Sequence, residues 1–314
     1  MLHSIAVLLI WVSGAVAALI PLGEKLNDRP VIGILTQEVT DPALMPYGKY
    51  YIPSSYVKYI ESGGARVVPI RLNQSIEDHE KIFNAVNGLL LIGGASNLET
   101  SEFAHTAGLY FQLALKANNL GDYFPIWGTC LGFQLLTVLV AEENLLSNTT
   151  TENIALSLNL TSEASNSRIF ASFPPDLFKA LSEEALTGNF HHYGVTKQVF
   201  MENKKLSSFF SVLSLNTAKN GAVFVSTVEG KKDPFYGVQW HPEVNRFQWH
   251  PNYSFPHSKN AVRLSSLLAE FFVNEARRSS HHFSHAEEES KALIYNYNPV
   301  YAEKISAYEQ VYFF

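Results

Sequence analysis

The sequence predicts an α/β fold in which helices cover both faces of a mostly parallel central sheet. Short, continuous apolar runs such as residues 31–35 and 88–92 are typical of strands that are buried on both faces. These runs alternate with longer segments of helical periodicity, which is the pattern of successive strand–helix–strand units. The chain has 314 residues, enough for one large domain or two smaller ones.

The first half of the chain contains four strand–helix pairs. The expected strands are 31–35, 66–70, 88–92 and 125–128, and the expected helices are 54–62, 76–86, 103–117 and 131–141. Ser54 or Ser55 is expected to cap the first helix, because serine accepts a hydrogen bond from the free N–H groups at a helix start. Active sites of such sheets lie at the carboxyl ends of the strands, where Gly93, Gly94 and Cys130 all fall.

The second half of the chain is less regular. Residues 144–168 are rich in Ser, Thr and Asn, which indicates surface strands and loops rather than a linker. Further strands are expected at 222–227 and 235–240, an amphipathic helix at 260–277, and a loop rich in His and Glu at 279–290. The tyrosine-rich tail, 292–314, should pack as extended segments on the same body. We therefore expect a single domain over residues 19–314.

The amino terminus has the pattern of a secretory leader. An apolar core at 5–12 is followed by small residues at 13–18, so we expect residues 1–18 to be a cleaved signal peptide. The apolar run is too short to span a membrane. Four Asn-x-Ser/Thr sequences agree with secretion and are candidate glycosylation sites: Asn73, Asn148, Asn159 and Asn252.

The composition excludes some classes of function. The formal net charge is −6, and no segment is basic enough for a nucleic-acid interface. Cys130 is the only cysteine, so the chain can form no internal disulfide, although secreted proteins usually contain them. The cluster His281, His282 and His285 lies in a polar loop after a helix, and we expect no metal there.

Cys130 lies in the motif Gly128-Thr129-Cys130-Leu131-Gly132, between an apolar run and a helix-like stretch. This is the pattern of a nucleophile elbow, a tight strand-to-helix turn that exposes a reactive side chain. A side chain at either glycine would crowd the turn. At the start of a helix, the dipole also stabilises a thiolate. A free cysteine is commonly a buried structural thiol, but the two glycines favour the nucleophile.

A thiolate nucleophile needs a base and an oxyanion site. His241, in Gly237-Val238-Gln239-Trp240-His241-Pro242-Glu243, follows a predicted strand and is the best candidate base. Glu243 could orient its ring. An isolated His-Pro-Glu is more often a surface turn, but the elbow favours the catalytic interpretation. The N–H groups of Leu131 and Gly94 are the candidate oxyanion donors.

Together, these motifs resemble the class I glutamine amidotransferase-like superfamily, and more narrowly the gamma-glutamyl hydrolases, also called folylpolyglutamate hydrolases. The segments 30–37, Asn189-Phe190-His191 and 269–277 support the resemblance, which covers nearly the whole mature chain. It implies a three-layer, flavodoxin-like domain. It also implies hydrolysis of gamma-glutamyl bonds in folate and antifolate polyglutamates, through a thioester on Cys130 with His241 as general acid/base.

The resemblance further places Glu243 third in the triad and assigns substrate contacts to His191, Gly93 and Gly94. The sequence His192-Tyr193 departs from the family pattern. The resemblance implies a lysosomal or extracellular location, a homodimer and no cofactor. The glutamate tail carries carboxylates, for which Lys49, Arg71 and Arg246 are unranked partners. Two alternatives remain: an amidotransferase glutaminase, which the leader and the lack of a synthase domain disfavour, and a secreted, non-enzymatic binding protein of the same fold.

Overall fold

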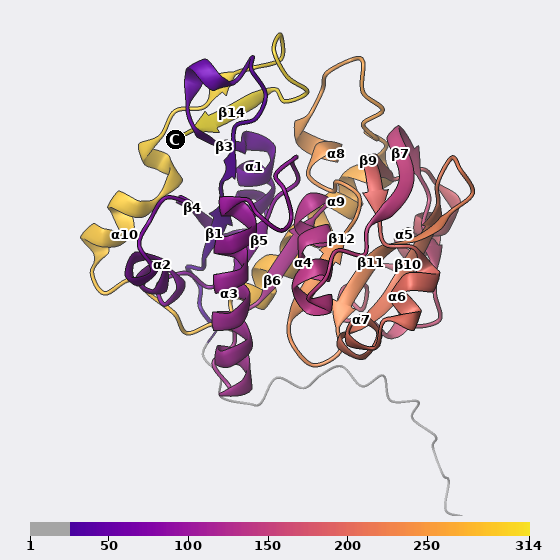
Figure 1. The fold of residues 1–314 in the computed structure, drawn as a ribbon, viewed down its shortest axis with the longest axis horizontal. Coiled ribbons are helices and arrows are strands. Elements are labelled where there is room, and N and C mark those ends of the chain that lie inside the picture. Colours follow the sequence, from indigo (N-terminus) through magenta and orange to yellow (C-terminus); the bar gives the residue numbers. More distant parts are fainter. Residues whose placement is uncertain (1–25) are drawn as a thin grey trace, which may run out of the picture.

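The computed structural model describes residues 26–314, which contain a central eight-stranded sheet (Figure 1). The first five strands in its order are parallel, and the remaining three are antiparallel. The order is β4 (Arg66–Ile70), β1 (Val31–Leu35), β5 (Leu89–Leu91), β6 (Ile126–Thr129), β12 (Phe235–Val238), β11 (Val223–Gly230), β10 (Phe210–Thr217) and β8 (Asn159–Leu160). The predicted fold class, an α/β domain with a mostly parallel sheet, is confirmed.

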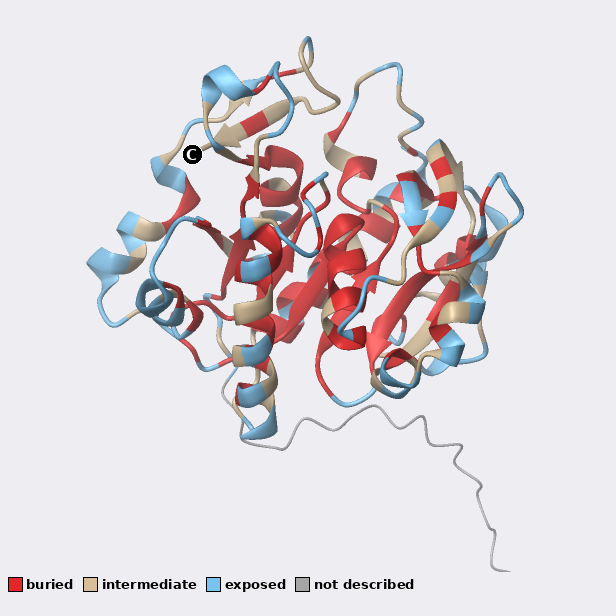
Figure 2. Ribbon diagram, in the orientation of Figure 1, coloured by how far each residue is buried: buried red, intermediate tan, exposed pale blue. Residues whose placement is uncertain are grey.

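Helices cover both faces of this sheet. Successive residues of a strand point to opposite faces, so Val31 and Leu35 join one apolar core and Ile32 and Ile34 the other. The first core is completed by α2 (Ile76–Phe83), α3 (Glu102–Asn119), α4 (Leu131–Ala141), α6 (Lys197–Glu202) and α7 (Lys204–Phe209). The second is completed by α1 (Ser54–Ser62), α5 (Pro175–Glu183) and α9 (Lys259–Ala276). Figure 2 shows the resulting buried interior, with the strands red and the helices red on their inner sides.

Two smaller sheets flank the carboxyl edge of the central one. The ladder of β7 (Ser147–Leu156) with β9 (Thr187–Gly194) is antiparallel. The other sheet has the order β13 (Val300–Tyr301), β14 (Gln310–Phe313), β3 (Tyr50–Pro53) and β2 (Gln37–Glu38). The end of the tail thus pairs with a strand from the beginning of the chain, as the yellow β14 beside the indigo β3 shows in Figure 1. The remaining helical turns are η1 (Met45–Tyr47), η2 (Ala164–Asn166), α8 (Val244–Phe247), α10 (Ala286–Ala292) and η3 (Ile294–Asn296).

Three local predictions are wrong. Neither Ser54 nor Ser55 caps α1, because β3 runs directly into the helix through Pro53 and both serines lie within its first turn. The helix expected at 76–86 ends at Phe83. The segment 279–290, expected to be a loop, includes most of α10, whose first turn carries three glutamates that favour a helix N-terminus.

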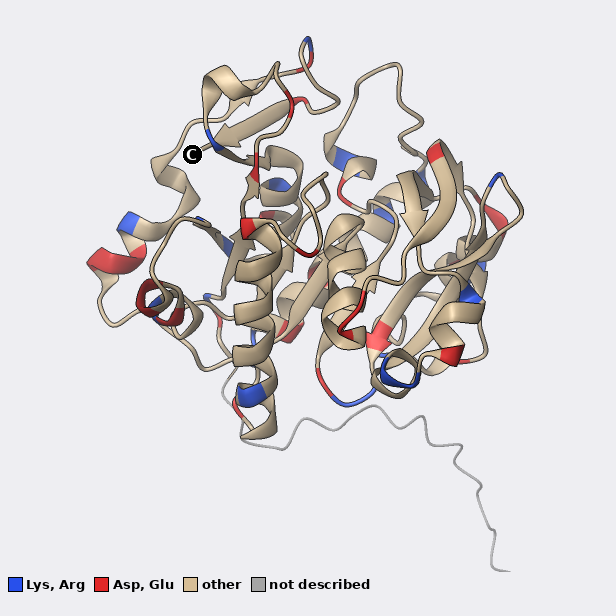
Figure 3. Ribbon diagram, viewed as in Figure 1, with Lys and Arg blue, Asp and Glu red and all other residues tan. Residues whose placement is uncertain are grey.

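The predicted signal peptide, residues 1–18, lies outside the described residues. Within residues 26–314, no helix combines the length and apolar character needed to cross a membrane. Figure 3 shows the charged residues largely on outer helices and loops, with few on the central sheet. The four candidate glycosylation sites, Asn73, Asn148, Asn159 and Asn252, are all exposed.

Candidate active site

The candidate site forms where three neighbouring parallel strands end. β5, β6 and β12 are adjacent, with Leu91 opposite Gly128 and Thr129 opposite Val238. Each strand therefore delivers its following residues to the same edge of the sheet. In this way the structure brings together the Gly93–Gly94 turn, Cys130 and His241, which are far apart in the sequence.

The turn at Cys130 has the strained geometry expected of an elbow. Cys130 has φ 52° and ψ −107°, a left-handed φ that residues other than glycine rarely adopt, and it directly precedes α4. Both flanking glycines permit close approach: a Cβ on Gly128 would lie 2.6 Å from the carbonyl oxygen of Gly132, and one on Gly132 would lie 2.1 Å from that of Leu91. Cys130 is 6% exposed and borders a cleft.

His241 bridges the thiol and a buried carboxylate. Its Nδ1 donates to Oε1 of Glu243 at 2.7 Å, so Nε2 is left for Cys130, with which the ring is hydrogen-bonded. Burial lowers the pKa of His241, but the charges of Glu243 and Cys130 and their hydrogen bonds outweigh it and raise the pKa well above the ordinary value. A protonated imidazole beside a cysteine is the arrangement that stabilises a thiolate, the reactive form of a cysteine nucleophile.

The two glycines after β5 differ in what their N–H groups can do. The N–H of Gly93 donates to the hydroxyl of Tyr56 at 2.9 Å and is thereby occupied. The N–H of Gly94 has no acceptor among the described residues. The N–H group of Leu131 lies at the first position of α4, where a helix offers no carbonyl acceptor of its own. The predicted oxyanion donors, Gly94 and Leu131, are thus both available.

Two residues that the sequence analysis did not single out hold this turn. The Nε2 of Gln37 donates to the carbonyl oxygens of Ile92 and Gly93, each at 3.1 Å. A Cβ on Gly94 would overlap the side chain of Gln37. The hydroxyl of Tyr56 also lies 3.4 Å from Nδ1 of His241. Gln37 ends the segment 30–37 that supports the family resemblance, whereas Tyr56 belongs to no recognisable motif, and neither carries a local signal for its place at this turn.

His191 lies on β9. A backbone hydrogen bond from the N–H of His241 to the carbonyl of Gly188 holds this strand beside the triad. Burial lowers the pKa of His191 to about 4, although its Nδ1 donates to the carbonyl of Tyr193 at 3.1 Å. The ring is therefore neutral near pH 7, with Nε2 unprotonated. That buried nitrogen has no hydrogen-bond partner among the described residues. His191 itself does not border the cleft.

A cleft of about 700 Å³ opens over the thiol and the imidazole. One wall is aromatic: the rings of Tyr253 and Phe255 stack at 5.5 Å, and Phe190 lies 5.7 Å from His241 between ring centroids. Another wall is the loop 303–308 between β13 and β14. Lys304, on that loop, is the only lysine or arginine among the described residues that line the cleft. Carboxylates line it as well, at Asp41, Glu152, Glu243 and Glu303.

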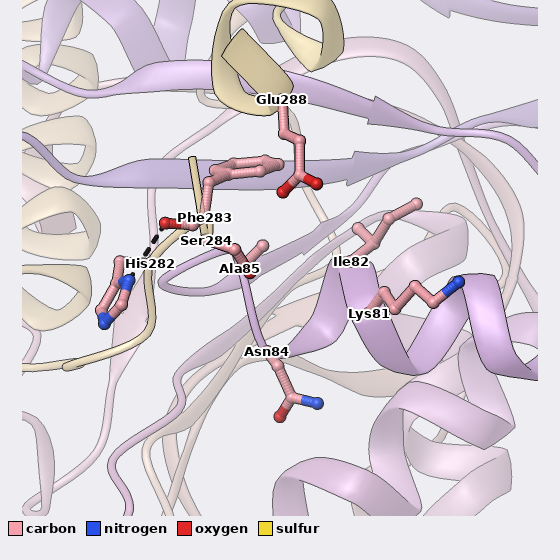
Figure 4. Close-up of a pocket in the computed structure, with 8 residues that line it drawn as sticks. All are labelled: Lys81, Ile82, Asn84, Ala85, His282, Phe283, Ser284 and Glu288. Atoms are coloured by element: carbon pink, nitrogen blue, oxygen red, sulfur yellow. Dashed lines mark hydrogen bonds between the residues drawn. The ribbon is translucent and has the colours of Figure 1, made fainter. Parts of the chain in front are cut away.

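The three cations considered from sequence lie elsewhere. Arg246 donates to Ser265 and stacks on Phe247, Arg71 lies over the ring of Tyr297, and Lys49 is exposed outside the cleft lining. A separate hollow of about 560 Å³ between α2 and the segment before α10 contains none of the predicted site residues (Figure 4). Within residues 26–314, no group of three or more His, Cys, Asp or Glu side chains could hold a metal ion.

Comparisons with known proteins identify the family of this chain. The model of the family described as Peptidase C26 matches residues 30–243, a range that includes Cys130, His241 and Glu243. The chain is 46% identical over 287 residues to the gamma-glutamyl hydrolase of Homo sapiens, covering 91% of this chain and 90% of that protein. It is 47% identical over 288 residues to that of Mus musculus, with coverage of 92% and 90%.

Among solved structures, a glutamine amidotransferase from Thermotoga maritima matches with a TM-score of 0.44 and 13% identity, over 80% of this chain and 99% of that one. The family match and the curated relatives confirm the resemblance inferred from the motifs. The chain belongs to the peptidase C26 family, together with the gamma-glutamyl hydrolases, and is a hydrolase of the cysteine-peptidase type.

Proposed function

We propose that this protein hydrolyses gamma-glutamyl bonds in folate and antifolate poly-gamma-glutamates, with Cys130 as nucleophile. The observation that carries the proposal is the Cys130–His241–Glu243 arrangement at the base of a cleft, in a chain whose curated relatives are gamma-glutamyl hydrolases. The lining of the cleft suits both parts of such a substrate: its aromatic wall suits a planar ring system, and Lys304 suits a carboxylate.

The chemistry follows the positions of the side chains. The Cys130 thiolate attacks the gamma-carbonyl carbon, and the oxyanion that develops accepts hydrogen bonds from the N–H groups of Gly94 and Leu131. The imidazolium of His241 then gives its Nε2 proton to the leaving amine, and a thioester remains. Neutral His241 next takes a proton from a water molecule, which attacks the thioester and releases the gamma-carboxylate and the thiolate.

His191 is proposed to contact the substrate. What supports this is its unprotonated Nε2, which is buried without a partner among the described residues and can accept a hydrogen bond from a substrate N–H. Because the residue lies behind the cleft lining, this contact requires a small shift of β9 or an intervening water. Gly93 is proposed to act only through its lack of a side chain, because a Cβ there would lie 2.8 Å from the ring of His241, and its N–H and carbonyl are bonded to Tyr56 and Gln37.

The test uses purified protein, a pteroyl poly-gamma-glutamate and free glutamine. We expect release of glutamate or polyglutamate, and a loss of about 10³-fold or more in Cys130→Ala. Ammonia release from glutamine without cleavage of the polyglutamate would replace this proposal with an amidotransferase glutaminase. Absence of product from either substrate, together with binding of the polyglutamate, would indicate a non-enzymatic binding protein.

We also propose that the protein is secreted or lysosomal, glycosylated and a homodimer. The exposure of Asn73, Asn148, Asn159 and Asn252 supports glycosylation. The apolar leader pattern supports entry to the secretory route. Expression in a secreting host should give protein in the medium whose mass falls after enzymatic removal of N-glycans. Light scattering then measures whether the mass is that of two chains.

A further inference from the structure

A side-chain amide, that of Gln239, contacts the nucleophile, and none of the roles assigned above involves it. Gln239 follows β12, two residues before His241, and is fully buried. Its Nε2 donates to the Sγ of Cys130 at 3.8 Å, within the range of an N–H···S hydrogen bond. Its backbone is fixed as well, because its N–H donates to the carbonyl of Ser226 at 2.9 Å.

The direction of this amide follows from a second glutamine. Gln134, on α4, donates from Nε2 to the carbonyl of Tyr193 at 2.7 Å and to Oε1 of Gln239 at 3.2 Å. A carbonyl can only accept, so the NH₂ end of Gln134 is fixed there. The oxygen of Gln239 must then face Gln134, because the reversed amide would place two NH₂ groups against each other. Its own NH₂ group is therefore turned toward the sulfur.

This donor interacts most strongly with a charged sulfur. Hydrogen bonds to ionised groups are roughly twice as strong as those between neutral ones, so the amide favours the thiolate over the thiol and over the thioester. A buried primary amide does not titrate, unlike His241. Its donation therefore persists at every pH at which the protein is folded.

We propose that Gln239 is a catalytic residue that stabilises the Cys130 thiolate through its side-chain N–H. Gln134 is a positioning residue, which acts through Gln239 by holding the amide in its donating direction. The carbonyl of Tyr193 that fixes Gln134 also accepts from Nδ1 of His191, so the same chain of hydrogen bonds connects β9 to the nucleophile. This inference rests on Cys130 being the nucleophile, but not on the identity of the substrate.

Alkylation by iodoacetamide tests it without any gamma-glutamyl substrate. Cys130 is the only cysteine, so the second-order rate reports its thiolate alone. In Gln239→Leu we expect the acidic limb of the rate–pH profile to shift to higher pH by about one unit, because one hydrogen bond to a charged group is lost. Gln134→Leu should move it in the same direction by less.

Asn216→Leu is the matched control, because Asn216 is a buried side-chain amide that donates to the carbonyl of Ser157, has no hydrogen bond to Cys130 and does not line the cleft. Its profile should coincide with that of the unmodified protein. Gln239→Glu keeps the shape of the side chain and replaces the N–H donor by a carboxylate near neutral pH. The acidic limb of this variant should therefore shift to higher pH by more than that of the leucine variant. If Gln239→Leu does not fold, the profile of Gln239→Glu tests the proposal by itself.

An unmoved limb in a folded Gln239→Leu or Gln239→Glu protein would overturn the role of Gln239. The outcome is independent of the proposed function. A protein that cleaves no polyglutamate can still show the alkylation shift, and an active hydrolase can lack it.

Discussion

At the scale of single residues, the charge of Glu243 decides over which pH range the thiolate–imidazolium pair exists. Glu243 is 2% exposed and holds Nδ1 of His241 at 2.7 Å. Because its negative charge helps to raise the pKa of His241, the pair persists as the pH rises until the imidazolium loses its proton. The alkaline limb of activity is therefore expected well above the ordinary pKa of histidine, about 6.5.

Glu243→Gln keeps the shape of this contact and removes its charge. The pKa of His241 should fall, so the alkaline limb of kcat/KM should move to lower pH by about one unit or more. The measurement is kcat/KM between pH 4 and 9. Glu303→Gln, which also removes a carboxylate from the cleft lining but does not contact His241, should leave that limb in place. An unchanged limb in Glu243→Gln would show that Glu243 does not set the charge of the imidazole.

Lys304 is a second residue whose charge has a predicted effect. In Lys304→Ala we expect KM for a poly-gamma-glutamate to rise by about 3- to 10-fold, because one charge-assisted contact to a carboxylate is lost. The side chain is exposed, so added salt should reduce the difference between the two proteins. Lys49→Ala, an exposed cation outside the cleft lining, is the control. Equal KM values for Lys304→Ala and the control would place the carboxylate elsewhere.

At the scale of elements, the close packing of α4 on β5 depends on Gly132. A Cβ at this position would meet the carbonyl oxygen of Leu91 at 2.1 Å, and this backbone atom of β5 cannot turn aside as the end of a flexible side chain could. Gly132→Ala should therefore lower the free energy of unfolding by about 3 kcal/mol and displace Cys130. Urea unfolding measures the first effect and alkylation of the thiol the second.

Gly108 provides the opposite case on a neighbouring helix. It lies within α3, where a Cβ would make only an ordinary contact of 3.5 Å with Leu139. Gly108→Ala should raise the free energy of unfolding by about 0.5–1 kcal/mol, because alanine loses less backbone entropy in a helix. Equal effects of the two substitutions would contradict the close-approach argument.

Elements buried on both faces could be predicted from sequence, and those formed by pairing of polar segments could not. β1, β4 and α4 have the predicted bounds, because continuous apolar runs leave little choice of structure. β9 contains two histidines, two glycines and an asparagine among its eight residues, so its local sequence gives little strand signal. In β10, shifts in register at Ser214 interrupt the alternation that would have indicated a strand.

At the scale of the whole molecule, the same distinction applies to the site. Cys130, His241 and Gly94 could be predicted because each lies one or two residues after a predicted strand, and the topology then brings the strand ends together. The walls of the cleft could not, because they come from β9, from the segment after α8 and from the tail. Only tertiary packing places Lys304 and Phe190 on the same cavity.

The burial of His191 makes the stability of the whole molecule depend on pH. The pKa of His191 is about 4 in the folded protein, below the value of about 6.5 expected for an unfolded chain. Between these values the unfolded chain binds a proton that the folded protein does not. The free energy of unfolding should therefore fall as the pH falls through this window, by up to about 3 kcal/mol from this group.

His191→Gln removes the titrating group and keeps a side chain that can donate to the carbonyl of Tyr193, so its free energy of unfolding should decline less between pH 6.5 and 4. Urea unfolding across that range measures the difference. His192→Gln changes an exposed neighbour and should follow the unmodified protein. His241 does not obscure the result, because it is present in all three proteins and its contribution to the pH dependence cancels when they are compared. Parallel curves for His191→Gln and His192→Gln would show that His191 accepts a proton in the folded protein without cost.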